Sequence, residues 1–195
     1  MMEYAAALYI VFLATRDDLL ELDARRRVYE QVTKYPGLHL SELARSTDLE
    51  VNHAKHHLRY LEKHNMVSSQ REDGYWRFYP RREGPLGAQE SIGADDKKIL
   101  ALLRRPLPLH VTLLLLNHQE MNHAQLREKT GAAHGTLHYH LKKMEKDGHL
   151  ESLKEGRERR YRLREHEKAL RLLIEHRPPD RLVKGFLEAW EALEI

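Results

Sequence analysis

Histidine is the residue type whose placement in this sequence points most directly to chemistry. Seven of the 14 histidines lie in two short segments: His53, His56, His57, His64, His134, His138 and His140. Pairs three or four residues apart share one face of a helix and could chelate a metal ion. No third ligand or carboxylate recurs at matching spacing, so we expect no metal and no cofactor. With a usual pKa of about 6.5, exposed histidines would instead donate hydrogen bonds to anions, more strongly at acid pH.

The two histidine-rich segments occupy equivalent places in an internal repeat. Residues 28–80 match residues 111–163 without a gap at a shift of 83, with ten identities in 53 positions and wider agreement of apolar positions. A repeat of this kind indicates that one structural module occurs twice.

Each copy predicts the same order of elements. In the first copy a helix stops at Pro36-Gly37, a short helix follows over residues 40–46, and a third helix begins near residue 51. In the second copy the short helix starts at Asn122 with Gln125 three residues later, a reciprocal capping pattern. After the third helix the period changes to two, and Asp73-Gly74 predicts the turn of a β-hairpin. Three helices and a hairpin make a winged helix-turn-helix, here twice.

The third helix of each copy carries one apolar stripe, formed by Ala54, Leu58 and Leu61 and by Leu137, Leu141 and Met144. The opposite face holds hydrogen-bonding and cationic residues. Segments 51–63 and 134–146 each have a net charge of +2, residues 68–82 and 151–164 are also net positive, and residues 180–195 are net −2. Because the whole chain is only +3, positive charge is concentrated on the third helices and hairpins.

Composition excludes several other classes. The chain has 195 residues, 41% of them hydrophobic, and no cysteine, which excludes a disulfide scaffold, a thiolate metal site and a cysteine nucleophile. No phosphate loop, dinucleotide-binding turn or nucleophile motif is present, so we do not expect an enzyme. The apolar run Tyr4–Ala14 is much shorter than the roughly 20 residues that span a bilayer, and we expect a packing helix there and no membrane association.

Three stretches resemble a known family: Pro36-Gly-Leu-His-Leu-Ser-Glu-Leu-Ala-Arg45, His57-Leu-Arg-Tyr-Leu-Glu62 and Gly135-Thr-Leu-His-Tyr-His-Leu141. They are similar to winged helix-turn-helix transcriptional regulators of the ArsR/MarR-like kind, and the tandem arrangement resembles regulators common in archaea. The resemblance implies that each third helix enters the major groove and that each wing touches the DNA backbone or minor groove. The first copy departs from the family at Val51-Asn-His-Ala54, so we expect the second copy to contribute more binding energy.

The predicted fold is mainly α with small β-hairpin wings (α+β): two tandem winged helix-turn-helix domains with extra N- and C-terminal helices. The predicted parts are an N-terminal helix over 1–19, domains over 20–82 and 95–165, a linker over 83–94, and C-terminal helices over 166–195. The last of these carries the stripe Leu182, Phe186, Trp190 and Leu193, which we expect to form a homodimer interface.

We therefore predict a transcriptional regulator that binds double-stranded DNA in the cytoplasm, associated with the nucleoid, with any small-molecule effector unknown. The alternatives are a winged-helix protein-interaction scaffold of the segregation and condensation type and a weakly specific chromatin-organising protein. The candidate DNA-binding residues lie on the third helices and wings: Asn52, His53, Lys55, His56, Arg59, Lys63, Arg71, Arg77, His134, Thr136, His138, Tyr139, Lys142, Lys143, Arg157, Arg159 and Arg160.

Overall fold

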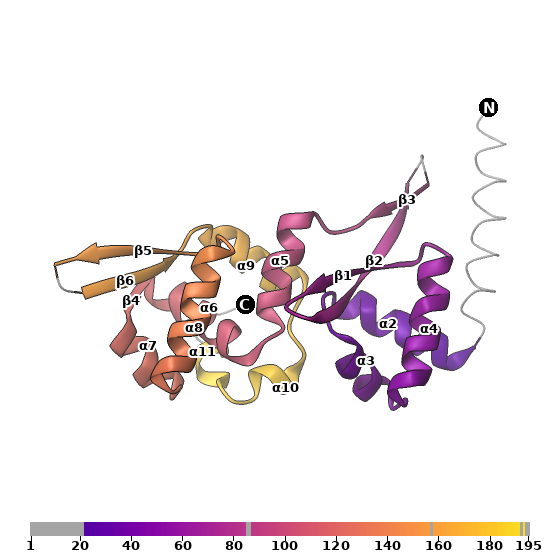
Figure 1. The fold of residues 1–195 in the computed structure, drawn as a ribbon, viewed down its shortest axis with the longest axis horizontal. Helices are drawn as coiled ribbons and strands as arrows, with labels where there is room; N and C mark the ends of the chain where they lie inside the picture. The colour runs from indigo at the N-terminus through magenta and orange to yellow at the C-terminus, as the bar shows by residue number, and fades with distance from the viewer. Residues whose placement is uncertain (1–21, 85–86, 157, 192, 194–195) are drawn as a thin grey trace. The chain divides into compact units, whose positions relative to one another are not determined.

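The computed structural model describes residues 22–84, 87–156, 158–191 and 193, and the chain divides into two compact units, Met1–Ile92 and Gly93–Ile195. The expected N-terminal helix over 1–19 lies outside the described residues. Helices and small antiparallel sheets make up both units (Figure 1), which confirms the predicted fold class.

Unit 1 begins with three helices, α2 (Asp23–Lys34), α3 (Leu40–Thr47) and α4 (Val51–Lys63). The hairpin strands β1 (Val67–Glu72) and β2 (Tyr75–Gly84) follow, joined by Asp73 and Gly74 at φ 51° and 83°. Positive φ at both turn residues gives a two-residue turn whose twist matches that of the strands. Sequence analysis assigns residues 83–94 to a linker, but β2 runs to Gly84 and β3 (Gly87–Glu90) pairs with it, because backbone pairing extends the sheet by one strand.

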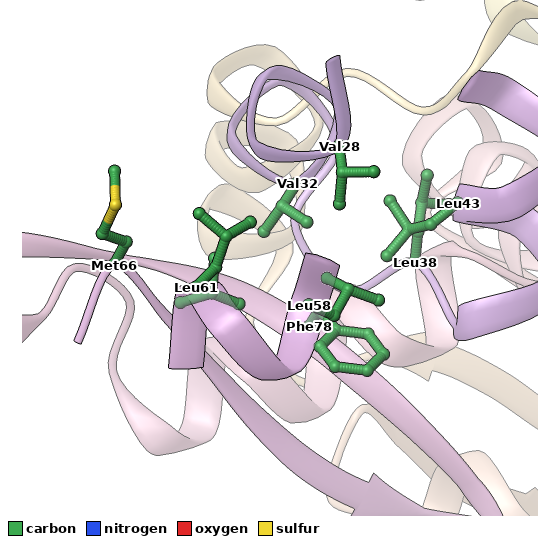
Figure 2. Packing of buried hydrophobic residues seen from close by; sticks show 9 residues of the cluster. Val28, Val32, Leu38, Leu43, Leu58, Leu61, Met66 and Phe78 are labelled. Atoms are coloured by element: carbon green, nitrogen blue, oxygen red, sulfur yellow. The ribbon is translucent and has the colours of Figure 1, made fainter. Parts of the chain in front are cut away.

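The core of unit 1 lies between its three helices and the hairpin. Its buried cluster comprises Val28, Val32, Leu38, Leu43, Leu58, Leu61, Met66, Val67 and Phe78, most of which Figure 2 shows. The predicted stripe of α4 is confirmed, since Ala54, Leu58 and Leu61 are at most 1% exposed. Removing these side chains from water holds α4 against α2 and fixes which face of α4 meets solvent.

Unit 2 contains the same order of elements, with additions at both ends. The helix α5 (Ala94–Leu103) precedes α6 (Pro106–His118), α7 (His123–Thr130) and α8 (His134–Lys146). Strand β4 (Glu120–Asn122) joins the hairpin β5 (Leu150–Glu155) and β6 (Glu158–Leu163) in the order β4-β6-β5. The helices α9 (His166–Glu175), α10 (Asp180–Val183) and α11 (Leu187–Glu191) complete it.

The two units match in detail at the start of the short helix. His39 forms an isolated β-bridge with Arg77, and 83 residues later Asn122 pairs with Arg160. Reciprocal caps follow in both: the His39 amide donates to Glu42 at 3.5 Å, and the Asn122 amide donates to Gln125 at 2.9 Å. In each unit, backbone pairing therefore joins the start of the short helix to the second hairpin strand, and a reciprocal cap begins the helix.

Within the described residues, no one helix is both long and apolar enough for a membrane crossing. The helices α5 and α6 are long and apolar enough only when they are taken together, and the chain bends by 102° between them.

Candidate nucleic-acid interface

The exposed face of α4 carries six of the predicted DNA-binding residues. Asn52, Lys55, His56, Arg59 and Lys63 all lie on the solvent side, as does His53, opposite the buried stripe. On the inner side, the guanidinium of Arg25 from α2 lies 3.6 Å from the centre of the Tyr60 ring, a cation–π contact that fixes α4 on its supporting helix. The result is a rigid helix that presents cations and hydrogen-bonding groups outward.

The helix α8 presents a similar face in unit 2. Thr136, His138, Tyr139 and Lys142 are exposed, and Tyr139 is 60% exposed. Lys143 differs, because its ammonium lies 3.1 Å from the Asp147 carboxylate and the side chain is only 20% exposed. The outward cations of α8 are therefore Lys142 and Lys146.

The two wings differ more than the repeat suggests. In unit 1 Arg71 is exposed, but Arg77 is 2% exposed and donates a 2.6 Å hydrogen bond to the Gly37 carbonyl. The assignment of Arg77 to the DNA-binding set is therefore wrong: the alternation of the strand turns this side chain inward, where it satisfies a backbone oxygen.

The arginines of the second wing face carboxylates. Arg160 Nη1 lies 3.0 Å from Glu120, Arg159 Nη1 lies 3.9 Å from Glu145, and Arg162 pairs with Glu151. Arg157 lies outside the described residues. These ion pairs lower the net positive charge that this wing presents, because Glu120 and Glu145 lie outside the segment over which the charge was counted.

A histidine cluster at the start of α8 includes a residue that sequence analysis missed. The ring of His123, the first residue of α7, lies 4.6 Å from that of His134 and 6.5 Å from that of His138, centre to centre. Burial lowers the pKa of His123, and repulsion from His134, His138 and Arg127 lowers it further. Only the packing of α7 on α8 brings these residues together, so spacing along α8 could not reveal the third member.

In the described part of the chain, no group of three or more histidine or acidic side chains is placed to hold a metal ion. On α4, the rings of His56 and His57 lie 5.6 Å apart, edge to face. Burial lowers the pKa of His57, and His56, Arg25 and His53 add to the effect. His57 is half-buried, in keeping with the structural role of a residue beside the apolar stripe.

Unit 1 also has a groove between α4 and the wing, with a volume of about 320 Å³. Lys55 and Arg59 of α4 lie on one side and Trp76 of β2 on the other. Trp76 and the neighbouring Tyr75 are 53% and 54% exposed, although aromatic side chains of this size usually cover a core. Both residues follow the predicted turn at Asp73-Gly74, and neither is among the DNA-binding residues predicted from sequence.

The C-terminal stripe does not form one helix. The chain breaks between α10 and α11, and Leu182 and Trp190 are buried at 9% and 7% exposure. Phe186 stacks on His110 of α6, with ring centres 4.6 Å apart, and Leu193 is half-buried. The continuous helix expected here is therefore wrong, because these side chains pack against α6 of their own unit.

Two comparisons with known proteins find similar sequences. Residues 22–87 match the family model HTH_HVO_0163_N, N-terminal HTH domain. An uncharacterized HTH-type transcriptional regulator of Methanocaldococcus jannaschii, MJ1398, is 30% identical over 157 residues, which cover 75% of this chain. The chain spans 36% of the length of that relative.

Two solved structures show a weak similarity to parts of the chain. HlyU from Vibrio cholerae is 23% identical, with a TM-score of 0.39, over 43% of this chain and 90% of its own. The transcriptional repressor BigR from Xylella fastidiosa is 22% identical, with a TM-score of 0.36, over 46% of this chain and 83% of its own. Residues 22–87 are therefore similar to an N-terminal HTH domain, and the three helices and hairpin of unit 1 have the element order of a winged helix-turn-helix.

Proposed function

We propose that this chain is a DNA-binding transcriptional regulator, not an enzyme, and that it acts on duplex DNA in the cytoplasm through α4 with its wing and α8 with its wing. The observation that carries the proposal is the face of α4: a helix held by a fully buried stripe turns Lys55, Arg59 and Lys63 to solvent. The name of the archaeal relative, an HTH-type transcriptional regulator, supports the same assignment.

Electrostatics favour a polyanion as the partner of α4. Among the described residues, Lys55, Arg59 and Lys63 form no ion pair with a carboxylate, so their charges are available to phosphates. Asn52 and His56 add hydrogen-bonding groups on the same face, which can contact base edges or phosphates. Lysine and arginine contacts to phosphate make binding depend steeply on salt.

The experiment measures fluorescence anisotropy of a labelled random-sequence duplex over a series of salt concentrations. Lys55→Gln/Arg59→Gln should weaken binding about tenfold and lower the slope of log affinity against log salt by about 1 to 2. Arg26→Gln/Arg27→Gln, on the exposed side of α2, removes the same charge from the same unit and should change binding little. No binding at low salt, or equal losses in both variants, would move the assignment to a protein-interaction scaffold.

The same assay compares the two units. Sequence analysis expects the second copy to contribute more, but Lys143 and the arginines of the second wing face carboxylates. We therefore propose the reverse order, in which Lys142→Gln/Lys146→Gln costs no more affinity than the α4 pair. A clearly larger loss from the α8 pair would restore the order expected from sequence.

Genome-wide occupancy then separates a site-specific regulator from a chromatin-organising protein.

A further inference from the structure

A pocket in unit 2 lies on elements that the proposed DNA interface does not use. Its volume is about 540 Å³, within the range of roughly 300 to 1,000 Å³ that small-molecule sites occupy. It lies between α6, the end of α7 and the C-terminal segment, and its lining residues are His110, Leu114, Asn117, His118, Lys129, Lys184, Gly185, Phe186, Leu187 and Ala189.

The break in the C-terminal segment is what forms this pocket. The helix α10 ends at Val183, the Phe186 amide donates to the Val183 carbonyl at 2.9 Å, and α11 begins at Leu187. The turn moves Phe186 away from the line of Leu182 and Trp190 and onto His110. The Asn117 side chain of α6 donates a hydrogen bond to the Ala189 carbonyl of α11 at 3.0 Å, after the turn.

One wall of the pocket is apolar and flat. The rings of His110 and Phe186 are stacked at 14° with centres 4.6 Å apart, and Leu114 and Leu187 lie beside them. Burial lowers the pKa of His110, which keeps its ring neutral near pH 7 and therefore part of the apolar wall. A planar or aliphatic body could cover this wall and bury apolar surface.

The charged side chains among the pocket's described lining residues are both positive. Lys129, at the end of α7, and Lys184, directly after α10, are both exposed, and neither forms an ion pair within the described residues. Among the lining residues that the structure describes, none is acidic; Glu120 and Glu128 line a neighbouring hollow that shares His118 and Lys129 with this pocket. Two lysines with no carboxylate among these described lining residues favour an anion.

We propose that this pocket binds a small organic anion, whose apolar body lies on Phe186 and Leu114 and whose carboxylate, sulfonate or phosphate head is held by Lys129 and Lys184. The site does not require the chain to bind DNA. Because α6 packs against α8 as well as lining the pocket, an occupant contacts the helix that supports the exposed face of α8.

The test uses the full chain and two matched probes. 1-Anilinonaphthalene-8-sulfonate carries an apolar body and a sulfonate, and N-phenyl-1-naphthylamine has the same body without the charge. Fluorescence titration of the wild type should give tighter binding of the sulfonate. Lys129→Gln/Lys184→Gln should weaken sulfonate binding roughly tenfold and leave the neutral probe unchanged, since only charge-assisted contacts are lost. Phe186→Ala should weaken both probes.

A control variant keeps this result specific. Lys146→Gln/Lys154→Gln removes two exposed lysines of α8 and β5, away from the pocket, and should bind both probes as the wild type does. Equal affinity for the two probes, or sulfonate binding that survives loss of Lys129 and Lys184, would overturn the anion site. Sulfonate binding that requires removal of residues 1–21 would also overturn the proposal, because the pocket would then bind the chain's own terminus. Sulfonate binding that falls as the mass in light scattering doubles would overturn it too, because the pocket would then bind a second copy of the chain.

Discussion

The imidazole Nε2 of His149 lies 2.9 Å from the Thr112 hydroxyl oxygen in the interior of unit 2. The same hydroxyl donates its only proton to the Pro108 carbonyl, also at 2.9 Å. With the hydroxyl proton directed at Pro108, Nε2 donates to the hydroxyl oxygen, and the single proton of the neutral imidazole lies on Nε2. This hydrogen bond connects α6 to the residue before β5, so it joins the supporting helix to the wing.

Burial lowers the pKa of His149 from 6.5 to about 4, and the nearby Asp147 only partly opposes the shift. Between these two pH values the unfolded chain binds a proton that the folded unit does not. The contribution of neutral His149 to the free energy of unfolding of unit 2 is therefore fully present above about pH 6.5. It is lost as the pH falls toward 4, and the total loss is about 3 kcal/mol. Urea unfolding followed by Trp190 fluorescence in a Trp76→Phe background measures this loss.

The matched variant is His149→Met, because Met66 occupies the equivalent position in unit 1 and is likewise buried. It should show a smaller loss of stability between pH 7 and 4 than the wild type, since carboxylates titrate in both chains and the histidine in only one. Identical pH profiles for the two chains would mean that His149 is not the group responsible.

Sequence patterns predicted the parts of the fold that depend on local periodicity. The apolar stripes of α4 and α8, the capping pair at Asn122 and the turn at Asp73-Gly74 all follow from spacing within a few residues, and all are present. The repeat added the element order of unit 2, because a gapless match carries local structure with it.

What sequence could not supply depends on residues far apart in the chain. Thr112 and His149 are 37 residues apart, and Arg77 reaches Gly37 across 40. The break after α10 follows from packing on α6, since nothing but Gly185 interrupts an otherwise regular stripe. Charge counting also failed at the second wing, where partners such as Glu120 come from another strand.

The buried Arg77 gives a prediction that separates stability from DNA contact. Arg77→Met leaves the Gly37 carbonyl without this donor, which should lower the free energy of unfolding of unit 1 by about 2 kcal/mol. Arg82→Met, an exposed position on the same strand, should have almost no effect on stability. Urea unfolding followed by Trp76 in a Trp190→Phe background makes the comparison. If Arg77→Met lost DNA affinity while keeping its stability, the residue would be a direct contact after all.

The cluster of His123, His134 and His138 predicts that DNA binding responds to pH. Because the pKa of His123 is lowered in the free protein, a nearby phosphate would favour its protonation, and binding would take up a proton. Affinity should therefore rise roughly three- to tenfold between pH 7.5 and 6. His123→Gln should flatten the profile, and His64→Gln, an exposed histidine of unit 1, should not. An unchanged slope in His123→Gln would exclude this histidine as the sensor.

Trp190 decides whether the C-terminal stripe stabilises unit 2 or joins two chains. Its ring is 7% exposed, the Arg177 guanidinium lies 5.5 Å from its centre, and α11 packs on α6. Trp190→Ala should therefore lower the stability of unit 2 by about 3 kcal/mol through the cavity it creates, and Leu187→Ala, at a position 47% exposed, by much less. Circular dichroism during urea unfolding measures both losses.

Light scattering on the same variants addresses self-association. The homodimer expected from sequence stays a prediction, but Leu182 and Trp190 are buried within their own unit, and Phe186 stacks on His110 of the same unit. Trp190→Ala should therefore leave the mass of the folded chain equal to that of the wild type, whatever that mass is. If the variant halved the mass and kept its stability, the stripe would be an interface between chains, and its packing on α6 would not describe the protein in solution.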